Sequence, residues 1–275
     1  MSEEEKIIPS LKSQSAWLLF AKVIGYFFVF LLPLLVVRFL SQKEVGEYRF
    51  IFQIIVNAVG ILPLGFSLSI YYFLSRSKEN RSRTVFNILL FNFVTGGIAF
   101  AILFFYPEIL GLIFESKELI RLAPLAGIVI WLWIFGIFLE IVAVANQEPK
   151  VAMTFIVLSQ VTKTFLMTLA VIIFVSVDAI LYAAMIQAGL QIIVLLFYLN
   201  SRFPKFWTSF DCTFFKKQAV YALPFGFAGV LWILQTDIHN YFVRYRFGEV
   251  SFAIYAYGCF EFPLFSMMYE SVSSV

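Results

Sequence analysis

Six ionisable side chains lie within long apolar stretches of this sequence, and each one needs a physical explanation. They are Lys22, Glu140, Lys163, Asp237, His239 and Glu261. A charged group inside hydrocarbon costs at least about 2.5 kcal/mol, so such residues line polar cavities or pair with one another. In that setting they can bind a charged substrate or carry protons. We therefore take them as the candidate functional residues.

Lys163 has the strongest claim to a role in binding. It lies near the middle of an apolar stretch, Val151–Val175, and is flanked by Gln160, Thr162 and Thr164. At that depth the ammonium cannot easily snorkel to the headgroups. It faces a watery cavity, where it can hold an anion, or it forms a structural ion pair with Glu140.

Lys22 and Glu140 lie at similar depths, near the cytoplasmic ends of their stretches. At about 1.5 Å per residue, Lys22 is about 10 Å from the cytoplasmic start of the first stretch. The two side chains can pair with each other. Alternatively, Lys22 contacts an anionic group of a substrate that enters from the cytoplasm, or it snorkels to the headgroups.

Asp237 and Glu261 fall at comparable depths in the seventh and eighth stretches, and His239, the only histidine, is close by. Two carboxylates in one low-dielectric site cannot both ionise easily, so one of them would hold a proton near neutral pH. This pattern suits a proton-coupled transporter. The alternative is that both carboxylates hydrogen-bond to kinked backbone or to other helices.

The elements that carry these residues are membrane helices. Hydrophobic residues make up 61% of the 275, charged residues only 13%, and the mean hydropathy is +0.91. Soluble proteins contain about 25% charged residues. An apolar run of roughly 20 residues crosses a bilayer as a helix, because backbone polar groups must be satisfied within the segment. We expect an all-α, polytopic transmembrane bundle of about eight spans: Ala16–Leu40, Tyr48–Leu74, Thr84–Tyr106, Leu119–Ala145, Val151–Val175, Ala179–Asn200, Gln218–Tyr245 and Phe252 onward.

Several residues should shape these spans. Proline removes a backbone donor and bends a helix, so kinks are expected at Pro33, Pro63, Pro224 and Pro263. Asp178 is the expected N-cap of the sixth span. Lys and Arg are more numerous on the side of the N-terminus, which places that side in the cytoplasm. The aromatic linker Ser201–Phe215 should then lie on the cytoplasmic interface.

The chain also repeats itself in outline. The first span leads into Arg38–Tyr48 and the seventh into Arg244–Tyr255, and superposing Tyr48 on Tyr255 aligns two basic helix ends, two short turns and two aromatic residues. The repeat predicts a six-helix lobe (1–200), an interfacial linker (201–215) and the start of a second lobe (216–275) of parallel topology. Because the chain stops within the eighth span, we expect a fragment of a longer protein.

Other classes of function lack support in the sequence. A formal net charge of +3 is too small to indicate nucleic-acid binding. Cys212 and Cys259 are far apart, and no metal-ligand spacing, Gly-rich phosphate loop or nucleophile elbow occurs. We therefore expect no cofactor, no metal site and no enzymatic activity.

Three motifs resemble those of the polysaccharide (Wzx-type) flippases in the multidrug/oligosaccharidyl-lipid/polysaccharide exporter superfamily. Arg38-Phe39-Leu40-Ser41 with Glu44–Tyr48 is similar to the first loop of that family. Leu64–Ser67 with Tyr71–Arg76 is similar to its second helix, and Lys217–Pro224 with Asp237 to its seventh. The order and spacing of these soft motifs along the whole chain carry the resemblance.

The resemblance implies two lobes around a central cavity and a flippase in the bacterial inner membrane. It would move undecaprenyl-pyrophosphate-linked oligosaccharide by alternating access for cell-surface polysaccharide such as O-antigen. Expected partners are this substrate, membrane lipids and a polysaccharide polymerase. A cation-coupled drug exporter of the same superfamily is the alternative. A membrane-embedded polymerase or ligase is a third, although every external loop is short.

Overall fold

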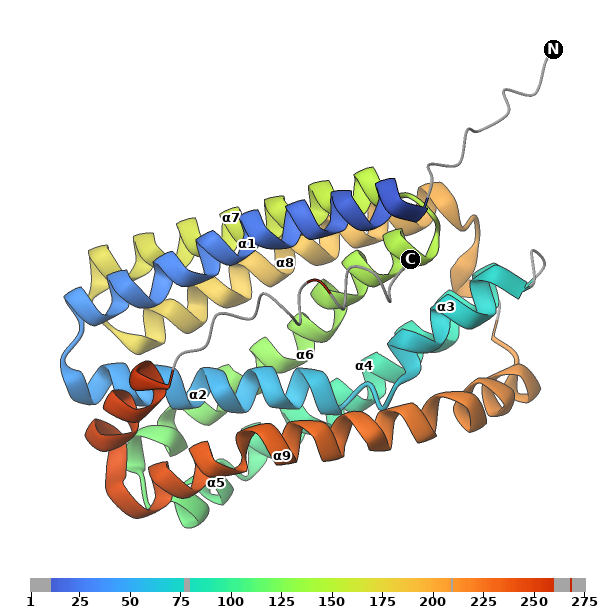
Figure 1. The fold of residues 1–275 in the computed structure, drawn as a ribbon. Helices are drawn as coiled ribbons and strands as arrows, with labels where there is room; N and C mark the ends of the chain where they lie inside the picture. The colour runs from blue at the N-terminus through green and yellow to red at the C-terminus, as the bar shows by residue number, and fades with distance from the viewer. Residues whose placement is uncertain (1–10, 77–79, 209, 260–267, 269–275) are drawn as a thin grey trace.

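The computed structural model describes residues 11–76, 80–208, 210–259 and 268. Every regular element in these residues is helical, which confirms the expected all-α class (Figure 1). Seven helical segments among them are long and apolar enough to cross a membrane. The predicted eighth span is described only as far as Gly258, and Glu261 and Pro263 lie outside the described residues.

The helices follow one another with short connections. In chain order they are α1 (Leu11–Phe39), α2 (Gln42–Ile61), α3 (Phe66–Arg76), α4 (Arg81–Phe105), α5 (Glu108–Phe114), α6 (Lys117–Ala145), α7 (Pro149–Phe174), α8 (Val177–Arg202), the 3₁₀ turn η1 (Phe206–Thr208) and α9 (Cys212–Gly258).

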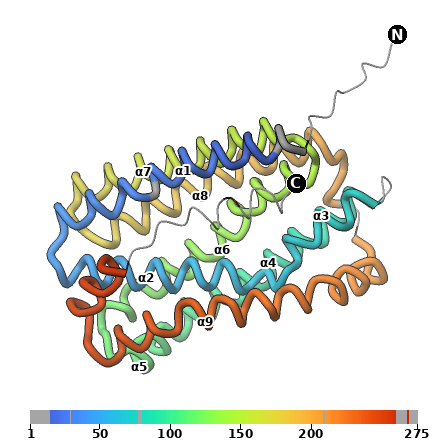
Figure 2. Tube along the Cα trace, in the orientation of Figure 1, coloured from blue at the N-terminus to red at the C-terminus, as the bar shows by residue number. Residues whose placement is uncertain are grey.

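The helices pack as a layered bundle. Helices α1, α7 and α8 lie side by side, although α1 and α7 are far apart in the sequence (Figures 1 and 2). Helix α6 runs through the middle and contacts α8 on one side and α4 on the other, while α2 packs between α6 and α9. Two clusters of buried apolar side chains fill the bundle. Helix α6 contributes to both clusters and is therefore the central support.

The predicted span Tyr48–Leu74 lies within one candidate membrane span, Gln42–Arg76, which is interrupted at the expected Pro63 kink, where the chain breaks between α2 and α3. Leu64 and Gly65 both have positive φ, 43° and 77°. A Cβ at Gly65 would overlap the carbonyl oxygen of Ala222 on α9, so the broken segment packs backbone to backbone against α9. Pro63 cannot supply a backbone N–H here, which explains why the helix ends at this position.

Two other prolines at which kinks are expected lie inside continuous helices, and the bends themselves stay predictions. Helix α1 continues through Pro33 and α9 through Pro224. The one non-helical residue in α9 is Gly248, with φ 78° and ψ −177°. Glycine tolerates this conformation because it has no Cβ. The expected loop between the seventh and eighth spans is therefore reduced to a single-residue kink.

The helix caps also correct one prediction. Helix α8 begins at Val177, and its N-cap is Ser176, whose hydroxyl accepts a hydrogen bond from the Ala179 N–H. Asp178 lies in the first turn instead and pairs with Arg121 of α6. The residue with a β-region backbone immediately before the helix takes the cap. That residue is Ser176, two positions before the predicted Asp178.

The linker before α9 is only partly exposed. Phe203 and Phe206 are buried in the bundle, whereas Trp207 and Phe210 are 53% and 51% exposed. Asp211 then caps α9, since its carboxylate accepts hydrogen bonds from the N–H groups of Thr213 and Phe214. The buried phenylalanines fix the linker to the bundle, and the interfacial position of its exposed aromatics stays a prediction.

Candidate functional site

A polar cavity of about 320 Å³ lies among four helices of the bundle. The lining side chains of α6 fall on one helical face, three or four residues apart, and those of α7 and α8 follow the same spacing. The walls come from Val56 and Val59 of α2; Trp133, Gly136, Ile137 and Glu140 of α6; Ser159, Gln160 and Lys163 of α7; and Gln187 and Gln191 of α8. The structure thus brings two predicted residues, Glu140 and Lys163, into one cavity.

Lys163 does not form the close ion pair that was one interpretation of the sequence. Its ammonium lies 3.9 Å from the centroid of the Trp133 ring. No hydrogen bond or ion pair of Lys163 is found among the described residues. A cation over an indole face gains about 0.5–2 kcal/mol and keeps its N–H donors available. The ammonium is therefore held in place without being neutralised.

Glu140 has a different environment in the same cavity. Its carboxylate accepts a hydrogen bond of 2.9 Å from the hydroxyl of Ser159. The charges of Lys22 and Lys163 both act on it. Lys22, half-buried on α1, belongs to the same electrostatic group without lining the cavity. The three predicted charges therefore form one cluster with an excess of one cation.

Several buried polar groups of the cavity lack a protein partner. Neither the Trp133 indole N–H nor the Gln160 side-chain oxygen makes a hydrogen bond among the described residues. Gln187 is only 2% exposed, and no hydrogen bond to its amide occurs in that same part of the chain. A buried polar group left unpaired costs about 1–3 kcal/mol. These unpaired donors and acceptors can form hydrogen bonds with a polar ligand that enters the cavity.

Sequence reasoning missed Trp133, Ser159, Gln187 and Gln191. Gln187 and Gln191 are four residues apart in an apolar helix, so they share a face. Trp133 precedes Glu140 by seven residues and shares its face as well. Glutamines at this spacing within a span were therefore a usable signal. The contact between Trp133 and Lys163 could not be predicted in this way, because it joins two different helices.

Of the second group of predicted residues, the structure describes Asp237 and His239. Asp237 is half-buried and accepts a hydrogen bond of 3.3 Å from Asn240. His239 is exposed, with its ring 5.7 Å from that of Tyr255. Within the described residues, no hydrogen bond or ion pair joins Asp237 to His239. Glu261 lies outside these residues, so the predicted carboxylate pair stays a prediction.

A hydrogen-bonded link between α2 and α9 lies near Asp237. The Asn57 amide accepts from Gln53 and donates to the hydroxyl of Tyr241, at 3.2 Å and 3.0 Å. The charge of Asp237 acts on Tyr241, one turn further along α9. No local pattern of residues indicates this link, because Asn57 and Tyr241 are 184 residues apart.

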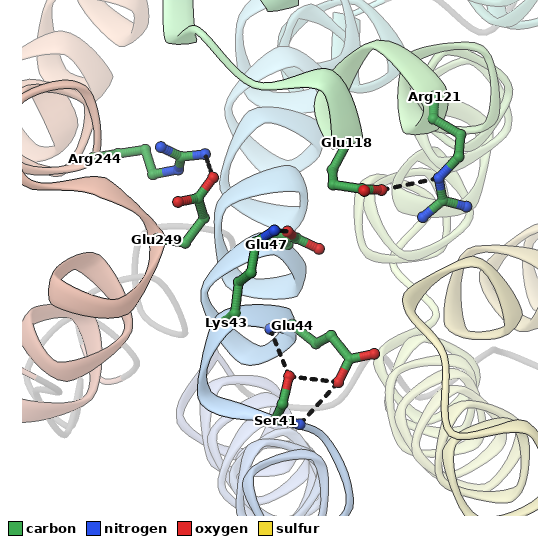
Figure 3. Close-up of polar contacts among 8 residues, drawn as sticks. All are labelled: Ser41, Lys43, Glu44, Glu47, Glu118, Arg121, Arg244 and Glu249. Carbon is green, nitrogen blue, oxygen red and sulfur yellow. Dashed lines mark hydrogen bonds and ion pairs between the residues drawn. The ribbon is translucent and has the colours of Figure 1, made fainter.

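Charged side chains gather around the first turns of α2 (Figure 3). Ser41 and Glu44 form a capping box, and Lys43 pairs with Glu47 at 3.7 Å. Arg244 and Glu249 pair at 2.6 Å on α9, across the kink. Nearby, Arg121 contacts Glu118 of its own helix at 3.0 Å. The predicted first-loop motif thus has a structural role, in capping α2 and joining it to α9.

The described residues contain no group of three His, Cys, Asp or Glu side chains that could hold a metal ion. Cys212 and Cys259 are free, exposed thiols. Seven long apolar helices identify a multi-pass membrane protein, and its internal cavity combines opposite charges with unpaired polar groups.

Residues 11–259 match the protein family described as "Polysaccharide biosynthesis protein". This chain therefore belongs to that family, which confirms the resemblance seen in the motifs. No protein of curated function matches the sequence.

Solved transporters share the fold. One is an outward-facing multidrug resistance MATE family transporter of the MOP superfamily, with a TM-score of 0.74, 14% identity and 96% of this chain covered. Another is a MOP superfamily transporter from Pyrococcus furiosus, with a TM-score of 0.72, 16% identity and the same coverage. This chain spans 62% of the length of each.

Proposed function

We propose that this protein moves a lipid-linked oligosaccharide, carried on undecaprenyl pyrophosphate, across the bacterial inner membrane. The movement occurs by alternating access of two lobes and involves no enzymatic step. The moved lipid would then serve a polysaccharide polymerase on the far side. Family membership and the shared fold of MOP superfamily transporters support this proposal.

One observation carries the proposal: the Lys163 ammonium lines a cavity inside the membrane and has no carboxylate partner within ion-pair distance among the described residues. A lysine in this position is costly unless it meets water or an anion. A diphosphate accepts strong, charge-assisted hydrogen bonds from an ammonium. The ring of Trp133 holds the Lys163 ammonium at the cavity wall, where its N–H donors are available to such a ligand.

Lys22 and Glu140 complete the proposed binding group. The charge of Lys22 acts on Glu140 from α1, on the side toward the chain's N-terminus. We place that side in the cytoplasm, so Lys22 meets the pyrophosphate first and Lys163 meets it deeper. Glu140 offsets one of the two positive charges, which keeps the site from holding the product too tightly.

The proposed division into lobes gains support from the kink of α9. Ser41, between α1 and α2, lies seven residues before Tyr48, and Gly248 lies seven residues before Tyr255. Superposing Tyr48 on Tyr255 therefore also aligns the break between α1 and α2 with the kink of α9. We propose a first lobe of residues 1–200, an interfacial linker of 201–215 and a second lobe that begins at 216. Asp237 and His239, with Glu261, would then couple ion movement to this second lobe.

A multidrug exporter is the second candidate, because one solved neighbour is a multidrug resistance transporter and Glu140 could hold a cationic drug. The two functions make opposite demands on the cavity charges. An oligosaccharide diphosphate requires the cation at Lys163, whereas a cationic drug requires the carboxylate at Glu140.

The test uses the complete protein in a bacterial host that lacks its own polysaccharide flippase. Lys163→Ala should abolish surface polysaccharide at an unchanged protein level in the membrane, while Lys163→Arg should retain part of it. Lys150→Ala, at an exposed position on α7, is the matched control. Normal polysaccharide in the Lys163→Ala variant would overturn the proposal. Drug export lost in Glu140→Gln and retained in Lys163→Ala would favour the exporter instead.

A further inference from the structure

An apolar groove follows the outer seam between α7 and α8. It consists of two hollows in line, of about 180 Å³ and 490 Å³. On α7 the lining residues recur every three or four positions from Phe155 to Phe174, and on α8 they run in the opposite direction from Val194 to Ser176, the N-cap of the helix. The two hollows thus form one track along the helical hairpin.

The length of this track matches the membrane. Phe155 and Phe174 are nineteen residues apart on one helix, which corresponds to about 28 Å at 1.5 Å per residue. The hydrocarbon core of a bilayer is about 30 Å thick. A single extended hydrocarbon chain would fill the groove, whereas the two chains of a phospholipid would not lie side by side in one helical seam.

On its inner side the smaller hollow is lined by Leu139 of α6 and by polar side chains. Ser159, Gln187 and Gln191 line both the smaller hollow and the charged cavity. These three polar side chains form a shared wall between the two spaces, beside Leu139. A Cβ at Gly136 would overlap the Gln191 side-chain oxygen, so the glycine leaves room for that amide.

A polar wall behind a lipid-facing groove is unexpected, because unpaired amides facing hydrocarbon are costly. Gln187 is 2% exposed and has no hydrogen-bond partner in the described part of the chain. A ligand that is apolar in the groove and polar at the wall would satisfy both surfaces. Beyond the wall, the Lys163 ammonium supplies a positive charge for an anionic group.

We propose that the α7–α8 groove holds the polyprenyl tail of a lipid whose diphosphate reaches the Lys163 cavity through the wall of Ser159, Gln187 and Gln191. This inference rests on the proposed function and assigns its substrate a lateral binding path. The tail stays on the outer surface of the bundle, while the charged group occupies the cavity. The side chains of the wall must part to admit the diphosphate.

The test is photocrosslinking of the complete protein in vesicles of phosphatidylethanolamine and phosphatidylglycerol with labelled undecaprenyl diphosphate. The photoreactive residue p-benzoylphenylalanine replaces Leu190, which lines the groove, or Phe197, which is 74% exposed on the same helix outside it. Labelling at position 190 should exceed that at 197 several-fold. It should fall to the level of the control when Lys163→Ala is added. Excess unlabelled undecaprenyl diphosphate should compete, whereas excess phosphatidylglycerol should not.

Three results would overturn the inference. They are equal labelling at the two positions, equal competition by phosphatidylglycerol, and labelling at position 190 that does not depend on Lys163. The last would show a lipid groove without a link to the cavity.

Transport measured in parallel separates this inference from the proposed function. Leu190→Trp should fill the groove and slow oligosaccharide transfer, whereas Phe197→Trp should not. If Leu190→Trp transports normally and labelling is unselective, the groove is refuted while the flippase function stands. If labelling is selective and depends on Lys163 but no oligosaccharide moves, the groove stands and the proposed function is refuted.

Discussion

Gly46 of α2 lies directly against the backbone carbonyl of Glu249 in α9, so close that a Cβ at position 46 would overlap the carbonyl oxygen and carbon. The contact joins the first turns of α2 to the kink of α9. The neighbouring group is backbone and cannot rotate away as a side chain would. The glycine of the first-loop motif is therefore a packing residue.

Gly46→Ala should lower the stability of the protein by about 1–3 kcal/mol, the usual cost of an overpacked core. An alanine within a helix would otherwise gain about 1 kcal/mol over glycine. The steric term should outweigh this gain, because α9 must move. Thermal unfolding of the purified protein in detergent measures the change.

Gly189→Ala is the matched control, since a Cβ at Gly189 on α8 meets no other atom within 4 Å. That variant should be as stable as the parent or slightly more so. Equal stability of the two variants would contradict the close contact between α2 and α9.

Removing one partner of the Arg244–Glu249 ion pair should lower the stability of the protein more than removing both. Arg244 is 3% exposed and Glu249 25%. Breaking a fully buried pair costs about 3–5 kcal/mol, because one charge is left uncompensated. The partial exposure of Glu249 reduces our expectation for Glu249→Leu to about 2–3 kcal/mol.

A double-mutant cycle provides the measurement. Adding Arg244→Met to Glu249→Leu should restore much of the lost stability, because no buried charge remains. If the effects of the two single substitutions simply add, the pair does not act as a unit in the folded protein.

The α9 cap should make stability depend on pH. The backbone N–H of Phe214 lowers the pKa of the Asp211 carboxyl, helped by the Thr213 N–H and by the charges of Arg83 and Lys217. Because the folded-state pKa lies below the unfolded value, the stabilisation is fully present above the unfolded pKa. It is lost as the pH falls through the folded-state pKa.

Hydrogen exchange at the Thr213 and Phe214 amides measures this effect. Protection should decrease as the pH falls below the ordinary carboxyl value of 3.8. Asp211→Asn keeps a capping oxygen but no titratable group, so its protection relative to neighbouring helical amides should stay constant. The same acid-induced loss in Asp211→Asn would assign it to another group.

The candidate site was predicted in part. Lys163 and Glu140 stand out in the sequence because charge within apolar residues is rare, and this signal needs no knowledge of packing. The indole beneath Lys163 and the glutamines of α8 were not found, since an uncharged side chain becomes meaningful only beside its neighbours. Asp237 and His239 are two residues apart on α9 and so lie on different faces of that helix. Their closeness in the sequence therefore does not make them neighbours, and their role in ion coupling stays a prediction.

The sequence by itself determined the solvent and the secondary structure. Long apolar runs must be helical in a bilayer, where the backbone has no water to bind, and Pro63 and Gly65 marked a weak point in the second run. Only the tertiary structure decided that α2 and α3 separate there, that Ser176 caps α8, and that Lys163 rests on Trp133 rather than on Glu140. Each of these outcomes depends on contacts between helices distant in the chain, which a local pattern of residues does not contain.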